Sequence, residues 1–260
     1  MRPPLLLHVA VLAALMSIGL PVRAQESDAG DEPAEPEPAS SRRGEVKLTL
    51  GHYAARHRAA PDGTDLNLRW RRHDTTLWAG AYHDADVGRT ARAGIEDRRA
   101  PWREAPVKVL SSFQVASGGF RGGQLGLETG ERWYAQVSLA RTNGRPYVNL
   151  NFDPNDAVIV AGGWRDEATG AFAVTAVRDD RFGTGQQHVH LNGQWVLPDH
   201  QRLTVDLLRK QGRGDDQVFI RRTGLTVTWD LPHWFARLAW DPRQNFGPAD
   251  VLRLSVGARF

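Results

Sequence analysis

The chain has no cysteine and only two methionines, both within its first sixteen residues. Without cysteine there can be no disulfide framework and no thiolate metal or redox site. No Walker loop follows a strand pattern, and no dinucleotide fingerprint is present. From residue 45 onward no window shows the 3.6-residue apolar stripe of an amphipathic helix. These absences exclude a disulfide-rich secreted module, a nucleotide-binding α/β domain and a helical bundle.

A long apolar run occurs at the amino-terminal end. It extends from Leu5 to Leu20, follows the basic Arg2, and is succeeded by Val22-Arg23-Ala24. Small residues at the two positions read by a signal peptidase predict a secretory signal peptide over residues 1–24, cleaved after Ala24. A membrane anchor is disfavoured, because the run is close to the short limit for spanning a bilayer. We therefore expect the mature chain to leave the cytoplasm, which argues against nucleic acid as a partner.

Residues 25–44 are rich in Asp, Glu and Pro and contain almost nothing apolar. Such a segment cannot bury enough surface to offset the entropy of ordering, so we expect a disordered tail. After this tail the balance of charge becomes basic. A basic exported domain suits either a cationic interior or anionic lipid headgroups.

From Glu45 to Phe260 the sequence alternates between apolar and polar residues. In the first segment Leu48 and Leu50 fall on one side, and Lys47 and Thr49 fall on the other. Alternation with a period of two indicates β-strands with one apolar face. Residues 45–260 are therefore predicted to be all-β, although the faces of 74–83 and 169–178 are not clear.

The aromatic residues recur at a regular spacing. Trp70, Trp102, Trp133, Trp164, Trp195, Trp229 and Phe260 follow one another at intervals of 31 to 34 residues. A hairpin of two strands with one short and one longer connection takes about 30 residues, so each aromatic marks the same end of successive hairpins. Trp78 and Trp234 lie across short turns from two of these positions and are expected at the same end. A rim of tryptophan is typical of a membrane interface. A soluble sandwich or barrel with tryptophan at one end is the alternative.

The last strand, "VLRLSVGARF", places Leu252, Leu254, Val256, Ala258 and Phe260 on its apolar side. In this the chain resembles the β-barrel proteins of the Gram-negative outer membrane, whose last strand commonly ends in Phe and is read by the barrel assembly machinery. The resemblance implies a transmembrane antiparallel up-and-down β-barrel in the bacterial outer membrane, with a periplasmic tail at 25–44. It also implies contact with outer-membrane lipid through the interface aromatics. These are Trp70, Trp133, Trp164, Trp195, Trp229, Trp234 and Phe260.

Seven hairpins give about 14 strands, or 12 if 74–97 or 105–128 is irregular. A barrel of this size encloses more space than its side chains need to fill. The predicted inner face carries more basic than acidic residues, which favours a small porin-like channel that prefers anions. The same charges could instead brace the wall in ion pairs around a closed lumen. The candidate lumen residues are Arg69, Arg92, Arg165, Arg222, Arg237, Arg253, Asp206 and Asp230.

Two further hypotheses concern the longer connections, which we place outside the cell. Asp153, Asn155 and Asp156 in one connection, and Asp179, Asp180 and Arg181 in another, could form the active site of an enzyme acting on lipid or glycan. Oxygen ligands there could also hold calcium, but Asx turns explain them more simply. His188 and His190 are two residues apart and suit two polar lumen positions better than a metal site.

We therefore expect neither metal nor cofactor, and a barrel that is a monomer rather than a trimer. The longest connection, around 141–157, is a candidate to fold into the lumen as a constriction.

Overall fold

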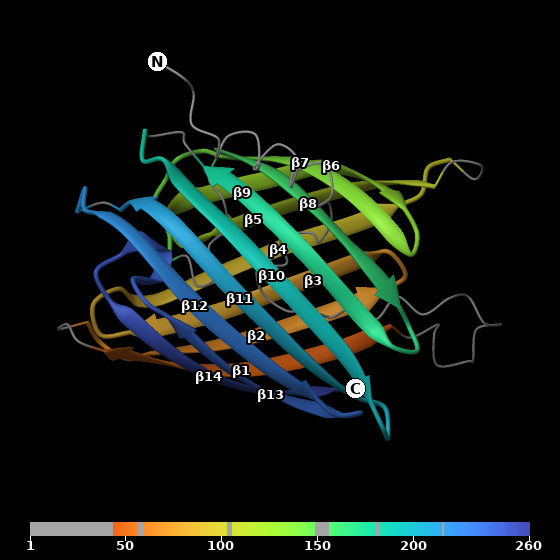
Figure 1. The fold of residues 1–260 in the computed structure, drawn as a ribbon. Coiled ribbons are helices and arrows are strands. Elements are labelled where there is room, and N and C mark those ends of the chain that lie inside the picture. Colours follow the sequence, from red (N-terminus) through yellow and green to blue (C-terminus); the bar gives the residue numbers. More distant parts are fainter. Residues whose placement is uncertain (1–43, 57–59, 103–105, 149–155, 180–182, 215) are drawn as a thin grey trace, which may run out of the picture.

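The computed structural model describes residues 44–56, 60–102, 106–148, 156–179, 183–214 and 216–260. The signal peptide predicted at 1–24 and the acidic tail predicted at 25–44, except for its last residue, lie outside these ranges. The described chain forms fourteen antiparallel strands and two short 3-10 turns, η2 (Ser117–Gly119) and η3 (Gln244–Phe246) (Figure 1). The strands are β1 (Glu45–Arg56), β2 (Gly63–Arg72), β3 (Thr75–Asp84), β4 (Gly88–Arg99), β5 (Val107–Ala116), β6 (Phe120–Gly130), β7 (Trp133–Thr142), β8 (Asp156–Asp166), β9 (Gly170–Asp179), β10 (Gln186–Leu197), β11 (Gln201–Arg213), β12 (Phe219–Asp230), β13 (Trp234–Asp241) and β14 (Asp250–Arg259).

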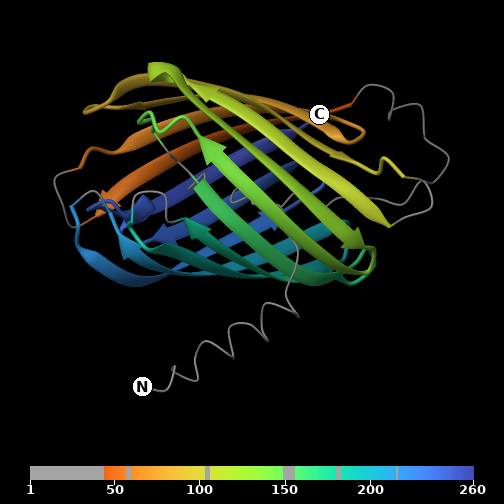
Figure 2. The same ribbon diagram turned by 90° about the horizontal axis from the view of Figure 1, so that it is seen from above.

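Each strand pairs with its neighbours in sequence, and β14 pairs with β1 to close the barrel. Figure 2 shows the first and last strands side by side in the wall. The closure continues beyond β14, because the Val46 amide donates to the Phe260 carbonyl at 3.1 Å and the Phe260 amide donates to the Val46 carbonyl at 2.9 Å. Closure removes the unpaired edges that an open sheet would expose. The prediction of an up-and-down barrel with 14 strands is confirmed.

The alternation read from the sequence decides which side chains face outward. On β1, Leu48 and Leu50 are exposed on the outer wall, whereas Lys47 and Thr49 are buried on the inside. The same pattern runs around the barrel, and every strand contributes an exposed large apolar residue. One from each strand is Leu50, Leu66, Leu77, Ile95, Phe113, Leu125, Leu139, Val158, Phe172, Leu191, Leu207, Leu225, Leu238 and Leu254. An apolar outer belt around a polar interior is the arrangement of a barrel that spans a bilayer.

The two ends of the barrel differ. We call the end at Phe260 the aromatic end and the other the far end. Connections at the aromatic end are short, at 73–74, 131–132, 167–169, 198–200 and 231–233, with 100–106 as the longer exception. The far end carries the longest connections, including 143–155 and 242–249, although those at 85–87 and 117–119 are brief. Short and long turns therefore segregate to opposite ends, as predicted.

Trp78 lies near the aromatic end, as predicted, but its side chain points inward. It pairs with Arg69 on β2, and the Arg92 guanidinium lies 5.8 Å from its ring centre. Its ring covers Gly94 of β4, where an added Cβ would be 2.6 Å from the indole. The two stretches in which irregular structure would have reduced the strand number contain the regular strands β3, β4, β5 and β6.

Among the described residues, no helix is long and apolar enough to cross a membrane.

Candidate functional site: the barrel interior

The inner wall carries many charged side chains. Strand register places these basic residues inside: Lys47, Arg69, Arg71, Arg92, Arg98, Lys108, Arg165, Arg202, Lys210, Arg222, Arg237, Arg253 and Arg259. The acidic residues on the same face are fewer: Glu45, Asp65, Asp84, Glu96, Glu128, Asp179, Asp206, Asp230 and Asp241. Positive charge exceeds negative charge on the described inner wall. The residues of the predicted lumen set are all on this inner face, and their lining of an open lumen stays a prediction.

Ion pairs link alternate strands near the aromatic end. Arg69 on β2 donates to Glu96 on β4 at 2.6 Å, passing over β3. Glu128 on β6 accepts from Arg98 on β4 at 2.6 Å and from Arg165 on β8 at 2.8 Å. The Glu128 side chain has no exposed surface. A buried carboxylate that serves two guanidiniums braces three strands at once.

Aromatic rings lie on the strands over which these pairs pass. The Arg165 guanidinium lies 4.3 Å from the ring centre of Tyr134 on β7. Phe235 on β13 lies beneath the contact between Arg259 on β14 and Asp230 on β12, with the Arg259 guanidinium 5.4 Å from its ring centre. Cations over ring faces gain electrostatic stabilisation in addition to their ion pairs.

Two acidic residues of the predicted lumen set have described partners. Asp206 accepts from His190 at 2.9 Å. Asp230 accepts from Arg259. Arg237 donates through Nε to the Thr228 hydroxyl at 3.0 Å. These arrangements depend on the stagger between strands, which alternation does not give.

Arg222 on β12 is exposed although its register places it on the inner wall, opposite Lys210. It donates to the carbonyl of Arg221 at 3.1 Å and forms no ion pair with a described carboxylate. On the same inner wall the His190 and Asp206 side chains are 21% and 25% exposed, whereas His188, Thr204 and Lys210 are buried. The inner wall over β10–β12 is thus accessible to water only in part, and it carries an uncompensated cation at Arg222.

The connection between β7 and β8 folds into the barrel as far as it is described. Tyr147 stacks on Phe120 of β6 with ring centres 3.6 Å apart. Val148 packs against Tyr53 of β1 and Val251 of β14, on the opposite side of the barrel from β7. The prediction of an inward-folded connection around 141–157 therefore holds for its first part, and residues 149–155 lie outside the described ranges.

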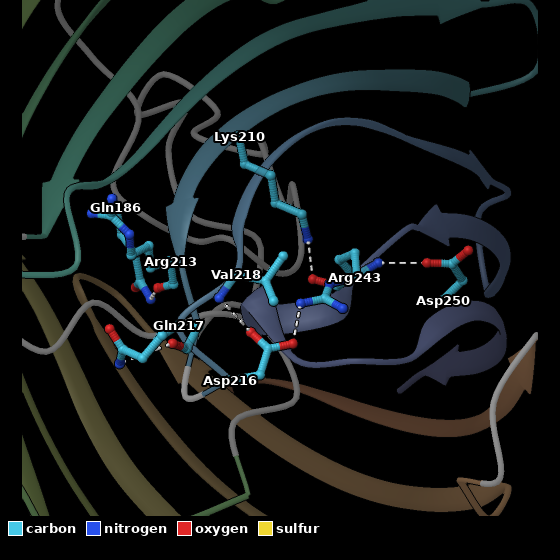
Figure 3. A network of polar contacts seen from close by, with 9 residues as sticks. Gln186, Lys210, Arg213, Asp216, Gln217, Val218, Arg243 and Asp250 are labelled. Carbon is cyan, nitrogen blue, oxygen red and sulfur yellow. Dashed lines mark hydrogen bonds and ion pairs between the residues drawn. The ribbon is translucent and has the colours of Figure 1, made fainter.

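The connection between β13 and β14 also folds inward, over the far end of β10–β12 (Figure 3). Phe246 is fully buried, and its ring centre lies 5.2 Å from that of His188. Lys210 donates to Asp241 at 2.5 Å and to the Arg243 carbonyl at 3.0 Å. Lys210 was not among the predicted lumen residues, and alternation does not show that a connection folds back over the wall.

The interior is not equally open on all sides. On β7–β9 the inward residues Gln136, Ser138, Ile159, Ala161 and Ala173 are at most 1% exposed. Side chains on the wall of a wide, empty lumen would be wetter than this. Other parts of the chain therefore cover this sector.

The candidate residues of the longer connections do not assemble into a described site. Asp156 is on the outer face, 3.7 Å from Arg141, and Asp179 is buried on the inner face. The two residues lie on adjacent strands but on opposite sides of the wall. Asp153, Asn155, Asp180 and Arg181 lie outside the described residues. No group of His, Cys, Asp or Glu suited to a metal ion occurs in the described part of the chain.

The predicted interface aromatics gather near the aromatic end. Trp133 and Trp164 are paired directly across β7 and β8, and the rings of Trp229 and Trp234 are 6.4 Å apart. Trp70 pairs with Val46 next to the closure, and Trp195 pairs with Gly170 at the start of β9. Their contact with lipid headgroups stays a prediction.

These features define the molecule as a closed, bilayer-spanning β-barrel with a polar, basic interior. No family model matches the sequence, and no curated protein matches it. Among solved structures the chain is similar to Salmonella typhi OmpF in complex with daunomycin, at 8% identity and a TM-score of 0.48, over 83% of this chain and 96% of that one. It is also similar to a mutant of the Rh. blastica porin, at 10% identity and 0.44, over 84% and 98%. The KdgM porin matches at 9% identity and 0.43, over 82% and 98%. Likenesses of this strength are too weak to assign the chain to a particular family.

Proposed function

We propose that the protein is an outer-membrane channel for small solutes, with a preference for anions. The observation that carries the proposal is Arg222, an exposed guanidinium on the inner wall with no described carboxylate partner. A guanidinium is always charged and draws anions into a water-filled space. The excess of basic residues on the described inner wall supports the same sign of selectivity.

The path for solutes passes the accessible residues of the inner wall over β10–β12, which are His190, Asp206 and Arg222. The β7–β8 connection packs against β1, β6 and β14, and the β13–β14 connection covers the far end of β10–β12, so both narrow the path. A path that is narrowed in this way suits small solutes. We therefore expect a lower conductance than that of an open barrel with the same number of strands.

We also propose that the aromatic end faces the periplasm. A signal peptide at 1–24, the short turns at this end and the aromatic rim support this orientation. In this arrangement Phe260 serves the barrel assembly machinery, and the far-end connections are extracellular.

The decisive experiment is planar-bilayer conductance of the refolded mature chain under a salt gradient. The reversal potential should indicate anion preference at low salt, and Arg222→Gln should shift it toward cations. The shift should shrink at ~1 M salt, where the screening length falls to about 3 Å. Arg141→Gln is the matched control, because Arg141 is an outward-facing arginine whose side chain is 83% exposed. Absence of any conductance would reject the channel.

A second candidate function is a structural barrel with a closed lumen. The buried brace at Glu128 and the covered wall of β7–β9 favour it. Arg237→Gln helps to separate the two, since Arg237 is 5% exposed and bonded to Thr228. If the lumen is closed, Arg237→Gln should be less stable than the wild type, and neither the variant nor the wild type should conduct.

A further inference from the structure

We propose that the outer face of β11 and β12, at the far end, binds the phosphate group of an anionic lipid. The proposal rests on the bilayer-spanning orientation described above. Three arginines on these strands, Arg209, Arg213 and Arg221, are exposed. Strand register places them on the face that carries Leu207 and Leu225, which is the outer wall.

The arginines lie within a compact polar patch. Arg221 pairs in register with Gln211, which pairs with Gln187 on β10, and the Gln211 amide donates to Gln187 at 3.1 Å. One step toward the belt, Arg209 donates to the hydroxyl of Thr223 at 2.9 Å. The patch therefore combines guanidinium, amide and hydroxyl groups, all of which can donate to phosphate oxygens.

The described acidic residues of β11, β12 and their connection are turned away from the patch. Asp216, in the connection between the two strands, binds Arg243 at 2.5 Å on the inward side (Figure 3). Asp206 on β11 and Asp230 on β12 face the interior, where they accept from His190 and Arg259. Positive charge on the outer face is thus not neutralised by these three carboxylates.

Apolar surface adjoins the patch on the side toward the aromatic end. Leu191, Leu207 and Leu225 are exposed on three neighbouring strands, and these residues pair across the strands in one row. An anionic lipid has a matching arrangement, because its phosphate group adjoins its apolar acyl chains. The row of leucines would contact the chains while the guanidiniums of Arg209 and Arg221 bind the headgroup.

The chemistry of the patch favours lipid over a second copy of the chain. A twofold contact through this face would bring the same arginines of both copies together, and like charges across an interface are unfavourable. Free inorganic phosphate would not use the adjoining leucines. We therefore commit to the headgroup of an anionic lipid as the occupant.

The test uses the full mature chain, refolded in a maltoside detergent and titrated with phosphatidylglycerol or phosphatidylcholine, with bound lipid counted by native mass spectrometry. The wild type should bind phosphatidylglycerol more tightly than phosphatidylcholine. The double variant Arg209→Gln/Arg221→Gln should lose about 25-fold in affinity for phosphatidylglycerol, since each basic residue near an anionic surface contributes about fivefold. Arg222→Gln, the adjacent residue on the inner wall, is the matched control and should bind as the wild type does.

Equal affinity of the wild type for the two lipids would overturn the proposal, and this comparison needs no variant to fold. A double variant that still prefers phosphatidylglycerol would also overturn it. The same holds if inorganic phosphate competes at the same concentration as the lipid, or if the wild type forms a dimer that the double variant does not form. Flotation of the wild type with phosphatidylcholine vesicles tests bilayer insertion separately. A protein that floats but shows no lipid preference would refute the lipid site while leaving the bilayer-spanning barrel intact.

Discussion

The ring of Phe235 on β13 occupies the space that a side chain at Gly257 on β14 would need. The two residues are paired across the strands, and a Cβ at position 257 would lie 2.2 Å from the ring. Cations surround the same ring, with the Lys47 ammonium 4.4 Å and the Arg237 guanidinium 5.5 Å from its centre. Gly257 therefore allows an aromatic ring and its cations to pack beside the seam where the barrel closes.

Gly257→Ala should destabilise the barrel by about 1–3 kcal/mol, because overpacking forces a ring or backbone shift. Gly51→Ala is the matched control in the neighbouring strand, where the nearest atoms to an added Cβ are 3.4 Å away. Urea unfolding of the refolded proteins, followed by tryptophan fluorescence, measures both. Equal stability of the two variants would show that the ring can move freely.

The brace at Glu128 gives the second prediction. Glu128→Gln removes the charge that Arg98 and Arg165 share and leaves two guanidiniums close together. Breaking a buried pair of this kind costs about 3–5 kcal/mol. Glu96→Gln should cost far less, because Glu96 serves Arg69 and its side chain is 29% exposed. An ion pair that water reaches contributes little to stability. The difference can be measured as the temperature at which each variant stops migrating as the folded form on a gel. A larger fall in this temperature for Glu96→Gln than for Glu128→Gln would contradict the assignment of the brace.

The wall could be predicted from sequence more completely than the interior. The spacing of the aromatic residues predicted the strand number, and alternation with a period of two predicted the inward position of Arg222. Which charges meet depends on the stagger of alternate strands, so the partners of Asp206 and Asp230 could not be assigned from the sequence. The inward course of the β13–β14 connection was also missed, since nothing in the pattern around Phe246 distinguishes an inward loop from an outward one.

Phe260→Asp should sharply lower the amount of folded protein in membranes. Phe260 is 77% exposed and hydrogen-bonded to Val46 at the barrel seam, so a carboxylate there would place charge beside the apolar belt. Phe260→Tyr should keep normal levels, because a tyrosine ring suits a membrane interface. Heat-modifiable mobility of the membrane fraction checks both, and normal folding of the aspartate variant would refute the role given to this residue.

Topology can be read by labelling, since the chain has no native cysteine. For the variant Val87→Cys, the replaced residue lies in the β3–β4 connection at the far end and is 53% exposed. Glu131→Cys lies in the turn between β6 and β7 at the aromatic end. An impermeant maleimide added to intact cells should label the first variant and spare the second until the cells are opened. The reverse pattern would invert the proposed orientation.

The last prediction concerns the β7–β8 connection inside the barrel. Tyr147→Ala removes the ring stacked on Phe120 and loosens one of the described contacts of this connection inside the barrel, another being Val148 against Tyr53 and Val251. If the connection narrows the path, single-channel conductance should rise and become noisier, while Arg222 continues to set the ion preference. Pro146→Ala is the control, because Pro146 is the exposed neighbour of Tyr147. An unchanged conductance in Tyr147→Ala, with normal folding, would mean that solutes pass elsewhere along the wall of β10–β12 and that the connection braces the barrel without limiting flow.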